Sequence, residues 1–206
     1  MPQWLFDECY DSVGDLAETI AHLVWEKKDI NDDLSTSLHQ KIYSFMQIKN
    51  ADDEKKLTME RFVHDGIVDL LLHEVGHTLG LRHNFKASSV YTVEQLSDPS
   101  FTKKHGITGS VMDYNASNLL DGGYTFFQTK PGPYDYWAIE YAYSELPFRS
   151  ELSEAEFLTN IASKSTNPYL AYATDEDTRG FGGTEMDPYA NVYDLGEDPM
   201  AFAEDT

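Results

Sequence analysis

The chain has 206 residues, of which 41% are hydrophobic and 13% aromatic, a length and composition that allow one domain with its own core. The 36 acidic residues outnumber the 15 basic ones and give a net charge of -21, which argues against nucleic acids and anionic membranes as partners. The sequence has one cysteine, Cys9, which excludes a structural metal site made of several thiolates.

Two amphipathic helices are the first predicted elements. Apolar residues recur at helical spacing between residues 13 and 25 and again between residues 34 and 46. The start of the chain lacks a basic region followed by an apolar run, so we expect no signal peptide in this chain. No stretch approaches the roughly 18 apolar residues of a membrane span. Residues 1–56 are therefore predicted to form a helical N-terminal segment.

A long helix is predicted next, over about residues 57–80, and its end carries the most informative string of the chain. Residues 73–83 read H-E-V-G-H-T-L-G-L-R-H. An α-helix advances about 100° per residue, so His73 and His77 project from one face and can hold one metal ion. Val75 and Leu79, among others, lie on the opposite face, which we expect to pack on the core.

Gly80, His83 and Glu74 complete the predicted site. Gly80 can adopt the left-handed conformation that ends a helix, which lets His83 return to the metal. Three histidine ligands leave one coordination position open, which is typical of a catalytic zinc site. Glu74 lies about 100° round the helix from His73 and is placed to reach a water molecule at the metal, so we predict it to be the general base. Gly76 disfavours the helix by up to about 1 kcal/mol, which indicates a segment passing close to this face.

Other interpretations of the same residues stay open. Glu94, seventeen residues after His77, could replace the third histidine, as in a gluzincin-type peptidase. The chain could also be a non-catalytic zinc-binding or regulatory module. A third alternative is a fragment that holds every zinc ligand but needs sequence upstream of it in order to fold or act.

Residues 84–133 are predicted to be mostly loop, with turn signals such as Asp98-Pro99 and Gly122-Gly123. We expect substrate contacts to concentrate there. Helices are predicted at residues 134–143 and 153–163, the second beginning with a capping box formed by Ser153 and Glu156. The remainder is predicted to be irregular.

The C-terminal part of the chain is strongly acidic. Residues 151–206 hold 13 acidic and 2 basic residues, a difference of -11. We predict an acidic C-terminal subdomain or tail, whose usual role is a solvated surface. Calcium is a second candidate cofactor, because several aspartates lie in the turn-rich sequence that hard cations favour: Asp175, Asp177, Asp187, Asp194 and Asp198.

The string S-V-M-D-Y at residues 110–114, together with the zinc string, resembles the metzincin metalloproteases. With further strings at residues 133–141, 175–177 and 193–196, the resemblance narrows to the bacterial Met-zincin domain family and covers about residues 57–200. It implies that Met112 is the structural methionine of a Met-turn beneath the metal. It also implies that Tyr114 is a catalytic residue that binds zinc or stabilises the transition state.

The resemblance further implies a zinc metalloendopeptidase with one zinc ion, acting on peptide or protein substrates in an extracellular or periplasmic location. The fold expected is mainly α, with a metzincin-like active-site helix, a Met-turn and a helical C-terminal subdomain. The N-terminal β-sheet of the clan is missing from this chain, so we expect a β-rich segment upstream in the same protein. The organisation predicted is a helical segment at 1–56, a zinc-binding catalytic core at 57–150 and the acidic part at 151–206, together forming one structural domain.

Overall fold

The computed structural model describes residues 59–120, 125–148, 150–179 and 187–205. The regular elements in these ranges are all helices, without a β-strand, which confirms the prediction of a mainly α fold. The two helices predicted at 13–25 and 34–46, and Cys9, lie outside the described residues. Within the described ranges, no helix has both the length and the apolar character needed to cross a membrane.

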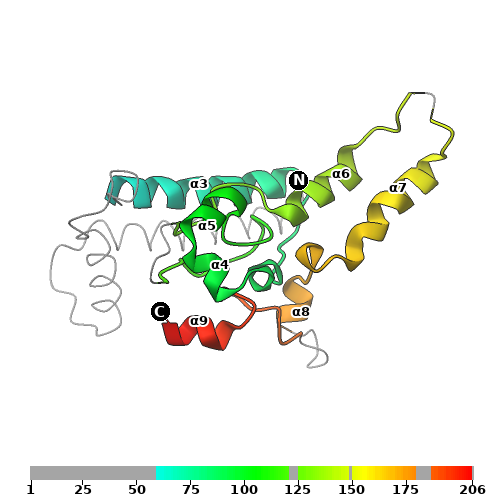
Figure 1. Cartoon of the computed structure of the whole chain (residues 1–206). Helices are drawn as coiled ribbons and strands as arrows, with labels where there is room; N and C mark the ends of the chain where they lie inside the picture. The colour runs from blue at the N-terminus through cyan, green and yellow to red at the C-terminus, as the bar shows by residue number, and fades with distance from the viewer. Residues whose placement is uncertain (1–58, 121–124, 149, 180–186, 206) are drawn as a thin grey trace.

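Helix α3 (Met59–Thr78) is the longest element in the described part, and it runs along one side of the molecule (Figure 1). Phe62 packs edge-on against Phe126 and Phe127, with ring centroids 5.6 Å and 4.8 Å away. One turn further along, a Cβ at Gly66 would stand 3.4 Å from the Phe127 ring. The buried face of α3 therefore begins with these aromatic contacts and continues through His73 and His77, which are 5% and 4% exposed.

The prediction that the opposite face of α3 packs on the core is wrong for Val75 and Leu79, which are 50% and 42% exposed. Val68 and Leu72, the other residues predicted for that face, are half-buried. The histidine face is buried instead because the Met112 segment lies directly against it. A Cβ on Gly76 would be 2.2 Å from the Met112 sulfur, which confirms the segment that the glycine indicated.

Residues 84–133 contain more helix than predicted. They include η2 (Ala87–Val90), α4 (Val93–Ser97) and α5 (Pro99–His105). Asp98, read from the sequence as part of a turn, is the N-cap of α5 and accepts a hydrogen bond from the Ser100 N–H at 2.8 Å. Local capping thus converts a turn signal into the start of a short helix.

A hydrophobic core joins α4, α5 and the C-terminal part of the chain. Leu195 and Phe202 are buried in the same cluster as four residues of the middle segment: Tyr91, Leu96, Ile107 and Leu120. Phe202 belongs to α9 (Pro199–Asp205). The acidic C-terminal part is therefore anchored to the middle of the chain by burial of apolar side chains.

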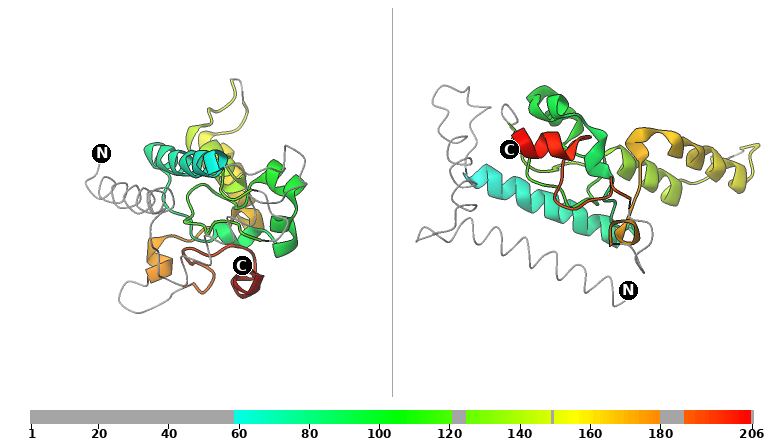
Figure 2. Two further views of the ribbon diagram at one scale, coloured as in Figure 1. Left: turned by 90° about the vertical axis from the view of Figure 1, so that its left-hand side faces the viewer. Right: turned by 90° about the horizontal axis from the view of Figure 1, so that it is seen from below.

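Helices α6 (Pro133–Tyr143) and α7 (Glu154–Ala162) contact each other and project from the rest of the molecule (Figures 1 and 2). The Trp137 indole N–H donates to the Ile161 carbonyl at 2.8 Å and ties the two helices together. Ser153 caps α7 in the predicted capping box. The short elements η3 (Ser163–Thr166), η4 (Pro168–Leu170) and α8 (Asp175–Arg179) bring the chain back towards the end of α3.

Candidate metal centre

Three buried histidines form the candidate metal centre. His73 and His77 come from the last turns of α3, and the chain then leaves the helix at Gly80, whose φ of 88° is in the left-handed region. This turn returns His83 to the same place. One ligand nitrogen from each of the three rings lies within 4.8 Å of the others, a spacing that can hold a metal ion.

In each of the three rings Nδ1, the outer nitrogen, lies close to an oxygen acceptor. His73 Nδ1 is 2.8 Å from the Val111 carbonyl oxygen, and His77 Nδ1 is 3.0 Å from that of Leu81. His83 Nδ1 is 3.1 Å from the Asp175 carboxylate. These acceptors assign the proton to Nδ1 in each ring, so the Nε2 lone pairs are left for the centre.

The inner nitrogens fit a bound cation. His73 Nε2 and His77 Nε2 are 3.0 Å apart. With both protons on Nδ1, two lone pairs face each other at this distance, an arrangement that a positive ion between them stabilises. A set of three neutral imidazoles is a donor set that zinc prefers.

The electrostatics of the buried face favour neutral groups. Burial, followed by the neighbouring His77 and His83 rings, lowers the pKa of His73 to about 3. This ring is therefore unprotonated and able to bind a metal at neutral pH. Burial also raises the pKa of Asp69, one turn earlier on α3, to about 7.

Tyr114 lies against the His73 and His83 rings. Its hydroxyl oxygen is 2.9 Å from His83 Nε2, and its ring stacks on His73 with a centroid distance of 5.2 Å. The Tyr114 carbonyl accepts a hydrogen bond from the Tyr193 N–H at 2.7 Å, which fixes the backbone behind the ring. The phenol is thus directed at the side of the site where Nε2 atoms converge.

Met112 is fully buried beneath the histidine face, against Gly76. The turn that carries it is held by Asp135, in the first turn of α6. The Asp135 carboxylate accepts hydrogen bonds from the Ser110 hydroxyl, from the Val111 N–H at 2.9 Å and from the Gly132 N–H at 2.7 Å. Burial raises the pKa of Asp135, and these donors lower it. No local sequence pattern predicts this role of Asp135, because its partners Ser110 and Val111 lie 25 and 24 residues earlier in the chain.

Asp175 is a second residue whose place the sequence did not reveal. The sequence pattern groups Asp175 with possible calcium ligands, but its carboxylate faces His83 Nδ1, and this contact lowers its pKa. The neighbouring Glu176 pairs with Arg82 through two hydrogen bonds of 2.8 Å and 2.9 Å. Helix α8 is therefore joined to the segment that carries His83.

The two glutamates considered from the sequence lie in different surroundings. Glu74 follows His73 on α3 and has one carboxylate oxygen buried from solvent. Glu94 is exposed in the first turn of α4 and is not part of the three-histidine group. Among the described residues, the geometry therefore groups His83, and not Glu94, with His73 and His77.

A family model whose description is Met-zincin matches residues 55–206, more than half of the chain. The matched region includes the three histidines, the turn with Met112 and Tyr114, and the acidic residues of α8. No curated protein and no solved structure matched the chain.

Proposed function

The chain belongs to the Met-zincin family, and we propose that it is a zinc-dependent metalloendopeptidase. The observation that carries the proposal is the arrangement of His73, His77 and His83, with their outer nitrogens on oxygen acceptors and their inner nitrogens converging. Three protein ligands leave a coordination position open for water or substrate, as catalytic zinc sites do. Peptide or protein chains are the proposed substrates.

His73, His77 and His83 would hold the zinc ion. When bound, zinc would make a water molecule acidic enough to react at neutral pH and would polarise the carbonyl group of the peptide. The Val111 and Leu81 carbonyls and the Asp175 carboxylate keep the three imidazoles in the required tautomer and orientation.

Glu74 is the proposed general base and acid. Its carboxylate takes a proton from the attacking water as the new carbon–oxygen bond forms, and then gives this proton to the amine nitrogen as the carbon–nitrogen bond breaks. The Tyr114 hydroxyl, which already lies at the inner side of His83, is the proposed hydrogen-bond donor to the negative charge that develops on the carbonyl oxygen. One carboxylate thus serves both proton transfers.

Removal of the metal provides the direct test. The purified chain is expected to contain one zinc ion and to cleave an unstructured protein such as reduced casein internally. Treatment with 1,10-phenanthroline should abolish cleavage, and added zinc should restore it. Metal content is measured by atomic spectrometry and the cut sites by mass spectrometry. One zinc ion without cleavage would favour the zinc-binding module, and cleavage that survives complete loss of zinc would contradict the proposal.

Asp175 is expected to strengthen zinc binding through His83. Replacing Asp175 by Asn weakens the acceptor for His83 Nδ1, so zinc affinity should fall by roughly 10- to 100-fold. Competition with a chromogenic chelator measures this affinity. Glu176→Gln is the matched control, because it removes one charge from the same helix but leaves the His83 contact in place. Equal affinities for the two variants would show that Asp175 has no positioning role.

A further inference from the structure

Asn84 follows His83 directly and is fully buried. Its side-chain NH₂ group donates to the Ala171 carbonyl at 3.0 Å, and its side-chain oxygen accepts from the Ala173 N–H at 3.2 Å. Only one of the two amide orientations places the donor on the carbonyl and the acceptor on the N–H, so these partners fix the orientation of the group. The Asn84 amide therefore joins the segment after the third histidine to backbone groups 87 and 89 residues later.

Residues 171–173 lead directly into α8, which carries Asp175. The Asp175 carboxylate lies 3.1 Å from His83 Nδ1. The Asn84 amide and this carboxylate therefore connect the same two stretches of chain. Because the contact is already 3.1 Å long, a displacement of Asp175 by about 0.5 Å would take its carboxylate out of hydrogen-bond distance.

We propose that Asn84 is a positioning residue of the metal centre, a role that rests on the proposed zinc function. Its side-chain amide holds residues 171–173 beside the third ligand and in this way presents the Asp175 carboxylate to His83. A carboxylate at the outer nitrogen makes an imidazole a stronger metal ligand. Asn84 acts on the metal only through these neighbours, because both polar ends of its amide are bound to backbone groups.

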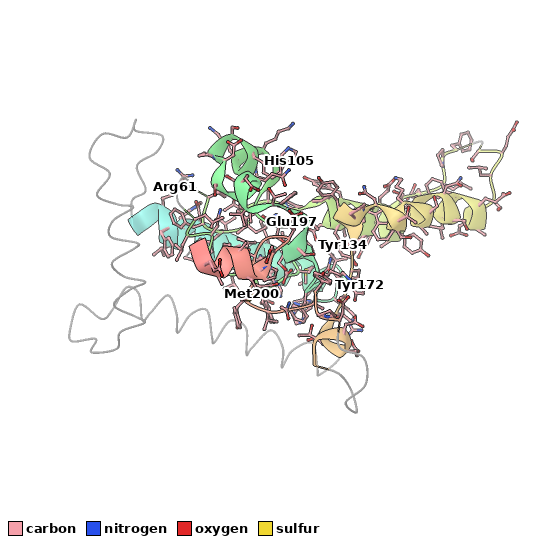
Figure 3. The ribbon with its side chains drawn as sticks, turned by 60° about the horizontal axis from the view of Figure 1, so that its bottom comes forward. Arg61, His105, Tyr134, Tyr172, Glu197 and Met200 are labelled. Atoms are coloured by element: carbon pink, nitrogen blue, oxygen red, sulfur yellow. The ribbon has the colours of Figure 1, made fainter. Side chains whose placement is uncertain are left out.

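Other contacts keep residues 171–173 near their place when the amide is absent. The Phe85 N–H donates to the Ala173 carbonyl at 2.8 Å, a backbone bond that does not depend on the side chain at position 84. Tyr172 stacks on Tyr134 of α6, with ring centroids 5.5 Å apart (Figure 3). A variant without the amide should therefore fold with this segment displaced rather than detached.

Replacement of Asn84 by Leu tests the role, with Asn118→Leu as the matched control. Asn118 is also fully buried, and its amide donates to the Leu96 carbonyl at 2.9 Å. Both variants should lower the midpoint of thermal unfolding of the zinc-free chain, because each leaves a buried backbone group without its partner. Only Asn84→Leu should also lower zinc affinity, by roughly tenfold, in competition with a chromogenic chelator. Unchanged affinity in Asn84→Leu and in the smaller Asn84→Ala would overturn the proposal, as would an equal loss in Asn118→Leu.

A double-mutant cycle shows whether Asn84 acts through Asp175. Zinc affinity is compared for the parent, Asn84→Leu, Asp175→Asn and the combined variant. If the amide works by placing the carboxylate, the combined loss of affinity should be clearly smaller than the product of the two single losses. A combined loss equal to that product would overturn the proposed route from Asn84 to the metal.

Hydrogen exchange in the parent chain provides a measurement that needs no variant. By reciprocity, a contact that strengthens zinc binding is itself stabilised by zinc. Zinc should therefore slow exchange of the Ala173 N–H, which bonds to Asn84, by a larger factor than exchange of the Asn118 N–H, which bonds to the Phe126 carbonyl. Equal factors would overturn the positioning role. A parent chain that binds no zinc would overturn the proposed function and this role with it, whereas a zinc-binding parent with unaffected Asn84 variants would overturn the positioning role alone.

Discussion

Glu74→Gln is expected to lower the rate of peptide cleavage by roughly 10²- to 10⁴-fold, the usual contribution of a general acid–base group. The amide keeps the size of the side chain but cannot take a proton from water at neutral pH. Zinc content should stay at one ion per chain, because the three imidazoles and their outer partners are unchanged. Initial rates with a fluorogenic peptide, at equal zinc occupancy, measure the effect.

Glu94→Gln is the control for the Glu74 variant. It removes the same charge from an exposed position on α4 and should leave both cleavage and zinc content unchanged. A Glu74→Gln chain with full zinc occupancy and the parent's cleavage rate would contradict the proposed base. Loss of zinc from Glu94→Gln would instead bring back the gluzincin-type alternative.

Asp135→Ala is expected to lower the free energy of unfolding by about 3 to 5 kcal/mol. Three donors lose their acceptor in this variant: the Ser110 hydroxyl and the Val111 and Gly132 N–H groups. All belong to buried residues, so water cannot readily replace the carboxylate. The start of α6 also loses a favourable negative charge. Urea unfolding of the zinc-free chain measures the change.

The Asp135 variant should also weaken zinc binding, because the released turn carries Val111, whose carbonyl orients His73. Glu145→Ala is the matched control, since Glu145 is exposed in the segment just after α6 and should change stability by less than about 0.5 kcal/mol. Asp135→Asn should lie between the two, because an amide oxygen can still accept some of the bonds. Equal stabilities for Asp135→Ala and Glu145→Ala would refute the role assigned to the carboxylate.

Stacking near the candidate centre illustrates what sequence patterns do not reveal. Tyr134 of α6 and Tyr172, 38 positions apart in the printed sequence, stack with ring centroids 5.5 Å apart and lie side by side in Figure 3. Tyr134 follows Pro133 in the string at residues 133–141, on which the family resemblance partly rests. That string by itself assigns no physical role to Tyr134. The contact depends on how α6 and the segment after η4 are folded together, and no local periodicity encodes that arrangement.

The apolar face of α3 was the clearest wrong prediction. Helical periodicity correctly placed Val75 and Leu79 opposite the histidines, but it could not tell which of the two faces meets the rest of the chain. Gly76 was the better indicator, because only a residue without a side chain accommodates the Met112 sulfur there. A glycine inside a helix can indicate a specific close neighbour, whereas an apolar stripe indicates only a preference for burial.

Local sequence patterns are enough to predict the spacing of the candidate metal ligands, the left-handed turn at Gly80 and the capping of α7 by Ser153. These features depend on helix geometry and on the conformational preferences of neighbouring residues, which act over a few positions. The folded chain, in contrast, is needed to see that Asp175 faces His83, 92 residues away, and that Asp135 holds the turn 24 residues before it. Such pairs result from burial and hydrogen bonding between distant segments, and the spacing of the residues in the sequence does not predict them.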